Sequence, residues 1–375
     1  SSFGVYMSQI TKKQHYVPQF LLRGFDATPN GSEKINVYDI HRNSARGLQS
    51  INSAFMQNYF YDKDNDVENF LSSKIEAPAS VVINEIRSGK VTKIQDQDTS
   101  LIKFIACLHS RTVEAQEDAL TFINAHFSEI VSDISRLNNL GIKDPTKFKL
   151  APKDKDAMRN FISERVYSGV LMSKGLEDLK FHLLVNKTNR EFIISDHPIT
   201  QYNWLYRELQ HPGIGSLMAK GVQFYLPISP TLCLCAYDPM SYKFGTRKSF
   251  VSDITSISDI DWLNDLQIRS ANSIIGYYST SMQPYIEGKS FLIGQKIYTR
   301  HSDHIGEITD NDGNLTTRHM AYTKQVRLTT KPSFYKVLKR AGSRSTIYEE
   351  RDPEVSSAML ELQKIAREQR RANEL

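Results

Sequence analysis

The first part of the chain carries apolar residues at helical spacing. Residues 67–88 place them at intervals of three and four, which predicts a helix that Pro78 breaks or kinks. Residues 101–130 continue the same pattern over a longer stretch and predict the longest helix of the protein. A further helix is expected near residues 154–172. Apart from one expected strand at 34–40, these patterns predict a mainly helical amino-terminal half.

Strand patterns dominate from residue 179 onwards, with Asn189 expected to turn the first strand into the second. Short apolar runs bounded by turn residues predict strands at 181–186, 191–195, 223–227, 231–237 and 273–279. A helix is expected at 258–270, and a strongly charged one at 353–371. Because helices come first and strands later, without regular alternation, we expect an α+β fold. In this fold a helical amino-terminal half packs on a mostly antiparallel sheet from the carboxyl-terminal half.

The composition is that of an ordinary globular protein. Of the 375 residues, 40% are hydrophobic and 24% charged, which allows a sizeable core. No apolar run approaches the roughly 20 residues that span a bilayer, so no membrane partner is expected. Three cysteines are too few for a disulfide framework and the start of the chain lacks a signal-peptide layout, which favours a cytoplasmic protein. We expect Met7 to be the native first residue, a single domain at 7–290, and a basic extension at 291–375.

A short apolar segment near the amino terminus has the start and stop residues of a helix. Its sequence is QHYVPQFLLRGF, residues 14–25. Pro18 suits its first turn and Gly24 its end. The segment is too short to be stable alone, so it is expected to dock on a larger element.

Three polar side chains accompany this segment. Gln19 and Arg23 are four residues apart, so one helical turn places both on the same face, with His15 just upstream. The three residues belong either to a polar network that ties the terminus to the core or to a functional site.

Two further residues could carry chemistry. Arg111 falls on or beside the apolar stripe of the long predicted helix, where a guanidinium needs a carboxylate or an anion. Asp196 follows an apolar strand directly, and side chains at a strand end are well held yet reach the surface. We expect Arg111 to pair with a carboxylate, Asp196 first. The alternatives are an arginine that reaches water at a helix edge and an aspartate that forms a turn before Pro198.

A basic tract lies at 318–345, with no acidic residue and with interleaved aromatic side chains. Such a tract could contact phosphates while its aromatic rings stack on bases. The alternative is a solvated face balanced by acids elsewhere. The candidate nucleic-acid-binding residues are Arg318, Lys324, Arg327, Lys331, Lys336, Lys339, Arg340 and Arg344.

Several common motifs are missing from the sequence. It has no P-loop, no strand-linked G-x-G-x-x-G, no H-E-x-x-H and no G-x-S-x-G elbow. The acidic cluster at 62–66 lacks the glycine and the distant glutamate of a calcium loop and is read as a turn and helix cap. We therefore expect neither a metal nor a cofactor.

The HYVPQF segment, the Arg111-Thr112 pair and the F-x-x-SD-x-P pattern that includes Asp196 together resemble an uncharacterised bacterial family with an HYVPQ signature. The resemblance spans roughly residues 12–280. Some relatives of that family occur in anti-phage defence systems, the Borvo type among them. The resemblance implies a family and a context, and no reaction.

Three hypotheses follow. In the first, His15, Gln19, Arg23, Arg111 and Asp196 converge in one cleft that cleaves nucleic acid, RNA being favoured, without a metal ion. In the second, the same cleft recognises a phage protein or a nucleotide and acts through a partner. In the third, these residues form a buried network without a site.

Overall fold

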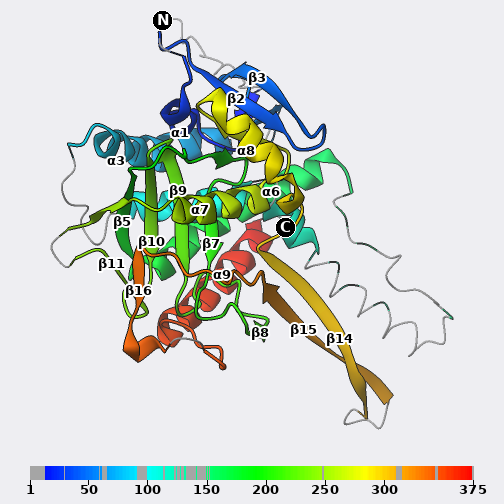
Figure 1. Ribbon diagram of the computed structural model, residues 1–375. Coiled ribbons are helices and arrows are strands. Elements are labelled where there is room, and N and C mark those ends of the chain that lie inside the picture. The colour runs from blue at the N-terminus through cyan, green and yellow to red at the C-terminus, as the bar shows by residue number, and fades with distance from the viewer. Residues whose placement is uncertain are drawn as a thin grey trace, which may run out of the picture.

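The computed structural model is shown in Figure 1. It describes residues 13–28, 30–58, 60, 66–90, 99–112, 115–121, 124, 127, 131, 141, 149, 151, 153–246, 249–309, 315–342 and 345–373. The described helices are α1 (Gln19–Leu22), α2 (Asp66–Phe70), α3 (Ala77–Arg87), α4 (Thr99–Arg111), α6 (Lys155–Met172), α7 (Ile257–Ser270), α8 (Gln283–Gly288) and α9 (Pro353–Asn373). Residues 115–121 are also helical.

Strands lie in both halves of the chain. They are β1 (Lys13–His15), β2 (Lys34–Asp39), β3 (Ser44–Ser50), β4 (Met56–Asn58), β5 (Lys180–Asn186), β6 (Ile194–Ser195), β7 (Thr200–Tyr202), β8 (Gln210–His211), β9 (Gln223–Ser229), β10 (Leu232–Tyr237), β11 (Tyr242–Phe244), β12 (Val251–Ile254), β13 (Ile274–Tyr277), β14 (Tyr298–Thr309), β15 (Leu315–Gln325) and β16 (Tyr335–Val337).

The largest described sheet has five strands in the order β12-β5-β10-β9-β7. Its pairs are antiparallel except that β12 runs parallel to β5. A second sheet, β3-β2-β13-β6, joins distant parts of the chain, because β13 lies between β2 and β6. The long strands β14 and β15 form a hairpin that pairs with β8 near its base and extends away from the body (Figure 1).

The predicted α+β architecture is wrong. The protein is a mixed α/β structure in which the helices are scattered and sheets occur in both halves. The sequence patterns placed elements along the chain, but strand partners come from far apart, as β2 and β13 illustrate. The hairpin expected at Asn189 is also absent, since β5 pairs with β10 and β12 whereas β6 pairs with β13.

The helix predicted at 67–88 is continuous from Asp66 to Arg87, and Pro78 does not break it. A π-helical segment, η2 (Leu71–Glu76), separates α2 from α3, and the N–H of Ala77 donates to the carbonyl of Ser72, five residues earlier. A proline ring clashes with the carbonyl four residues before it in an α-helix. The wider π turn just before Pro78 relieves this clash, and π turns occur often at functional sites.

The first helix within the stretch predicted at 101–130 ends earlier than expected. Helix α4 ends at Arg111, and the helical path resumes at residue 115. Nine of its residues are buried between the other helices and the sheet, which explains the strong apolar stripe. Much of the remaining predicted stretch, including Phe122, Ile123 and Ile130, lies outside the described residues.

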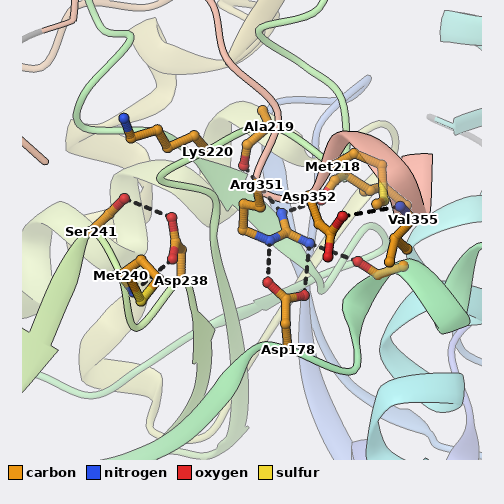
Figure 2. A network of polar contacts seen from close by, with 12 residues as sticks. Asp178, Met218, Ala219, Lys220, Asp238, Met240, Ser241, Arg351, Asp352 and Val355 are labelled. Atoms are coloured by element: carbon orange, nitrogen blue, oxygen red, sulfur yellow. Dashed lines mark hydrogen bonds and ion pairs between the residues drawn. The ribbon is translucent and has the colours of Figure 1, made fainter. Parts of the chain in front are cut away.

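The carboxyl-terminal segment packs on the rest of the chain. Strand β16 pairs with β11, and Phe334 and Tyr335 are buried in an aromatic cluster that also holds Tyr225 and Trp262. Further on, the guanidinium of Arg351 donates to both carboxylate oxygens of Asp178 and to the backbone carbonyls of Gly175, Leu217 and Ala219 (Figure 2).

Asp352 then caps helix α9, because its carboxylate accepts the N–H groups of Glu354 and Val355 (Figure 2). These contacts join residues 291–375 to the preceding ones through side chains as well as strand pairing. None of the helices among the described residues is long and apolar enough to cross a membrane.

Candidate active site in an amino-terminal pocket

The first helix is held against the sheet by a close backbone approach. Pro18 has an extended conformation (φ −60°, ψ 138°) and precedes α1, whose first N–H bonds go back to its carbonyl. Helix α1 ends at Leu22 with Arg23 as its C-cap, so Gly24 follows the helix end as expected, and the chain continues there as the 3₁₀ turn η1 (Arg23–Phe25). A Cβ at Gly24 would lie 2.1 Å from the carbonyl oxygen of Ile228. Glycine is required here because α1 touches strand β9.

A single arginine of α3 links these elements. Arg87 donates from Nε to the carbonyl of Ile228 at 2.8 Å, from Nη1 to that of Phe20 at 2.7 Å, and from Nη2 to that of Leu21 at 2.8 Å. It thereby supplies donors to carbonyls at the end of α1, which a four-residue helix cannot satisfy internally. Helix α1, helix α3 and strand β9 are fixed relative to one another.

A pocket of about 290 Å³ opens between α1 and the helical segment 66–87. Its volume is at the lower end of the range for small-molecule sites. Its lining combines three of the predicted site residues with groups from α2, η2 and α3. The lining residues are His15, Pro18, Gln19, Phe20, Arg23, Glu68, Ser72, Glu76, Ala77 and Ser80.

The predicted polar residues of α1 contact one another along this wall. The Nη2 of Arg23 donates to Oε1 of Gln19 at 3.2 Å, as the four-residue spacing indicates. The Nε2 of Gln19 is 3.5 Å from Nδ1 of His15, whose Nε2 is 3.3 Å from the carbonyl oxygen of Ile51. If Nε2 donates to that carbonyl, Nδ1 is the nitrogen on the pocket side and accepts from Gln19. Arg23 also pairs with Glu33 at 2.8 Å.

Arg111 pairs with a carboxylate, and that carboxylate is Glu76. Its Nη1 lies 2.7 Å from Oε1 of Glu76, and its Nε donates to the carbonyl of Tyr16 at 3.2 Å. The arginine side chain is 1% exposed, whereas that of Glu76 is 22% exposed and lines the pocket. Arg111 therefore stands behind the pocket wall and positions Glu76 within it.

The carboxylate of Asp196 binds the backbone around the start of strand β13. Its carboxylate accepts the backbone N–H groups of Asn272 (2.8 Å), Ser273 (2.7 Å) and Ile274 (3.1 Å), which precede or begin strand β13. Asp196 is 2% exposed and does not line the pocket. Burial of Tyr16 raises the pKa of its phenol, and the negative charge of Asp196 adds to this effect. Asp196 thus holds together the edge where β6 and β13 meet.

His197 and His109 form a pair of histidine rings in contact near the end of α4, outside the pocket. Their ring centroids are 5.4 Å apart in an edge-to-face arrangement, and Nδ1 of His197 contacts the hydroxyl of Thr112. Burial lowers the pKa of His109 to about 3, and the pKa of His197 to about 4. Both rings are therefore neutral at physiological pH.

Some of the predicted nucleic-acid-binding residues contact other parts of the protein, whereas others are exposed. Arg327, Lys331 and Arg340 contact the protein itself: Glu208 at 3.2 Å, the carbonyls of Pro332 and Tyr335, and the carbonyls of Pro239 and Met240. Lys324 lies over the ring of Tyr322. Lys336 and Lys339 are exposed. Arg318 lies on β15 opposite Gly306, and Arg344 lies outside the described residues.

The sequence analysis missed the acidic and hydroxyl groups of the opposite pocket wall. Glu68, Ser72, Glu76 and Ser80 are separated by four, four and four residues, so they share one helical face. That spacing is visible in the sequence as a polar stripe beside the apolar positions of 67–88. Nothing in the sequence, however, shows that this stripe faces α1.

The chemistry of the pocket is that of proton transfer and anion stabilisation. A histidine nitrogen, a carboxylate and a guanidinium face the same space, and each is oriented by a neighbour. Among the described residues, no group of three or more His, Cys, Asp or Glu side chains has the arrangement of a metal site.

The chain belongs to the family described as "Protein of unknown function (DUF4238)", which matches residues 13–281. The match includes both walls of the pocket as well as Arg111 and Asp196, and it ends before β14. No curated protein and no solved structure matches the chain.

Proposed function

We propose that the protein is a bacterial antiviral defence effector that cleaves RNA without a metal ion in the amino-terminal pocket. The observation that carries this proposal is that His15, Arg23 and Glu76 line one pocket. These are the group types that move a proton and stabilise a charged phosphate during RNA cleavage. The defence context rests on the resemblance of the HYVPQF segment to a family with relatives in Borvo-type systems.

The proposed reaction uses the 2′-hydroxyl of RNA as the nucleophile. The hydroxyl first donates its hydrogen bond to Glu76, then displaces the amide of Gln19 from Nδ1 of His15 and passes its proton to that nitrogen. The 2′-oxygen attacks phosphorus, the bond to the 5′-oxygen breaks, and the 5′-oxygen takes a proton from water; the hydroxide that remains takes the proton held by His15, which restores the neutral imidazole. Arg23 stabilises the negative charge that builds up on the phosphoryl oxygens. The product ends in a 2′,3′-cyclic phosphate.

Three of the predicted site residues act indirectly in this proposal. Arg111 holds Glu76 in place, and Asp196 supports the fold through the backbone at 272–274. Gln19 contacts both His15 and Arg23 and orients them.

The test is cleavage of a labelled single-stranded RNA by the purified protein in the presence of a chelator. We expect cleavage of RNA and none of the same sequence carrying 2′-O-methyl groups. Arg23→Gln is a suitable variant because the Arg23 side chain is 45% exposed, so its loss is expected to leave the fold intact. It is expected to lower the rate by about 10²-fold or more, the range for one charge-stabilising group.

Arg42→Gln is the matched control, because Arg42 is an exposed arginine outside the pocket lining. Expression in cells tests the proposed role in defence. Arg23→Gln and His15→Ala are each expected to abolish toxicity to the cell or protection against phage. Equal cleavage by the Arg23 variant and the control, or cleavage of the 2′-O-methyl substrate, would contradict the proposal.

One observation favours a second function, recognition of a phage component without catalysis. The polar groups of the pocket already bind one another: Gln19 contacts His15 and Arg23, and Glu76 binds Arg111. A preorganised polar pocket of this kind suits ligand binding. A wild-type protein that binds a phage component, leaves RNA intact in every condition tested and loses that binding on Arg23→Gln supports this second function.

A further inference from the structure

The two walls of the amino-terminal pocket differ in the hydrogen-bonding groups that they present. On the helical wall, the hydroxyl of Ser72 donates to the carbonyl of Asn69 at 3.2 Å. In the same way, the hydroxyl of Ser80 donates to the carbonyl of Ala77 at 2.8 Å. Each hydroxyl uses its single proton on the backbone, so its oxygen offers only lone pairs to a ligand. Both serines therefore act as acceptors towards the pocket.

Two carboxylates lie on the same wall. Glu68 and Glu76 both line the pocket and are eight residues apart, which is about two helical turns. An ionised carboxylate donates no hydrogen bond, and its two oxygens have about four lone-pair sites for accepting them. Together with the two serine hydroxyls, these carboxylates form what we call the acceptor wall, which consists of Glu68, Ser72, Glu76 and Ser80. A ligand that binds there must present hydrogen-bond donors to it.

The opposite wall, which α1 forms, has a different chemistry. The amide of Gln19 and the guanidinium of Arg23 supply N–H donors to the pocket. The ring of Phe20 also lines the pocket and is only partly buried, and its centroid lies 5.4 Å from that of Phe104. An aromatic ring held in this way is a platform on which a nucleic-acid base can stack. The pocket thus combines a stacking ring with an acceptor wall.

We propose that the acceptor wall recognises guanine, so that RNA is cut on the 3′ side of guanosine. Guanine is the RNA base that presents two adjacent donors on one edge, N1–H and the N2 amino group, and these match the two oxygens of Glu68 while the base stacks on Phe20. Adenine and cytosine would place an acceptor nitrogen against the carboxylate, and uracil would place carbonyl oxygens there. The inference rests on the proposed function, because it takes RNA as the ligand.

This arrangement leaves the reacting groups in their proposed places. With guanine at Glu68, the ribose of the same nucleotide lies towards Glu76, which accepts its 2′-hydroxyl, and the 3′-phosphate lies towards Arg23. Glu68 contacts the base and no reacting atom, so it is a specificity residue. Its replacement is therefore expected to change which sequence is cut more than the rate of the chemical step.

The first experiment measures binding without cleavage. Isothermal titration calorimetry compares the full chain with the 3′-monophosphates of guanosine, adenosine, cytidine and uridine. The guanosine compound is expected to have a dissociation constant lower by about tenfold or more, the effect of one well-placed bidentate contact to a base. Inosine 3′-monophosphate keeps the N1–H of guanine and lacks the N2 amino group. It is expected to bind about tenfold more weakly than the guanosine compound, since one hydrogen bond to a carboxylate is lost.

Three variants then assign the preference to its residues. Glu68→Gln replaces one acceptor oxygen with an amino group, and it is expected to bring the affinity for guanosine 3′-monophosphate to that for the other three compounds. Glu85→Gln is the matched control, because Glu85 is an exposed glutamate of α3 outside the pocket lining, and it is expected to keep the preference. Phe20→Leu is expected to weaken binding of all four compounds about equally, since stacking tolerates every base.

Mapping the cuts in a labelled RNA that contains all four bases connects recognition with the reaction. Wild type is expected to cut after guanosine, and Glu68→Gln to cut without this preference. Cleavage by wild type without base preference would overturn the inference and leave the proposed function standing. Guanosine-selective binding without cleavage would contradict the proposed function and support the inference. Equal dissociation constants for the four monophosphates, or no binding of any of them, would also overturn the inference.

Discussion

The pairing of Glu76 with Arg111 can be tested by a double-mutant cycle. The perturbations are Glu76→Gln, Arg111→Met and the two together. Glu76→Gln leaves a guanidinium that is 1% exposed without its carboxylate, whereas Arg111→Met leaves a carboxylate that is 22% exposed and reaches water through the pocket. The double variant removes both charges and replaces them with groups of similar size.

The expected magnitudes follow from this asymmetry in burial. Removing one partner of a buried ion pair costs about 3–5 kcal/mol, and the partial exposure of Glu76 places Glu76→Gln at about 3 kcal/mol. In the Arg111→Met background the same change is expected to cost less than about 1 kcal/mol, because the glutamine can bind water in the pocket. The coupling energy is therefore about 2 kcal/mol or more.

Urea unfolding followed by circular dichroism measures the free energies, and hydrogen exchange over residues 66–87 locates the change. A coupling energy below about 0.5 kcal/mol would show that the pair does not hold Glu76 in place, and the reasoning would fail. The double variant also separates structure from chemistry. If it folds normally yet has lost RNA cleavage, Glu76 acts in the reaction as well as in the fold.

Three further predictions concern residues outside the pocket. Asp196→Asn is expected to cost about 2 kcal/mol of stability, since an amide has one acceptor oxygen for three backbone donors, and its melting temperature should fall while RNA cleavage by the remaining folded protein persists. The pKa of His197 is about 4 in the folded protein, below the ordinary 6.5, so its contribution is present above pH 6.5 and is lost as pH falls towards 4. Between pH 6.5 and 5 the loss is about 2 kcal/mol, and urea unfolding of His197→Gln should show a correspondingly weaker pH dependence. Changing Lys336 and Lys339 together to Glu is expected to weaken RNA binding about equally for many sequences and to reduce its salt dependence, measured by fluorescence anisotropy; unchanged binding would remove these lysines from the RNA interface.

The spacing of residues in the sequence correctly predicted some local contacts and elements. The contact between Gln19 and Arg23 follows from a four-residue spacing, which is a property of any helical turn. The same holds for the strands near 181–186 and 223–227, which the structure contains as β5 and β9 with slightly different ends. Such features depend on neighbours in the chain, so the sequence alone specifies them.

Residue spacing could not predict contacts between residues that are far apart in the sequence. Arg111 was expected to meet a carboxylate, because a buried guanidinium requires one, but its partner Glu76 comes from a π turn that no apolar pattern indicates. Asp196 was predicted to have a functional role, yet its carboxylate oxygens accept hydrogen bonds from backbone N–H groups 76 to 78 residues further along the chain. In each case the physical requirement was visible in the sequence, whereas the identity of the partner depended on tertiary structure.

The position of Arg87 has a consequence for how the protein folds. Its three donors join α1, α3 and β9, of which β9 begins more than a hundred residues after α3, and α1 has too few residues to persist alone. The amino-terminal helix therefore becomes ordered late, after the sheet has formed and α3 has docked on it. During synthesis on the ribosome, residues beyond Ile228 must emerge before the amino terminus can settle. The amino-terminal pocket, of which α1 forms one wall, would then be complete only after most of the chain has been made.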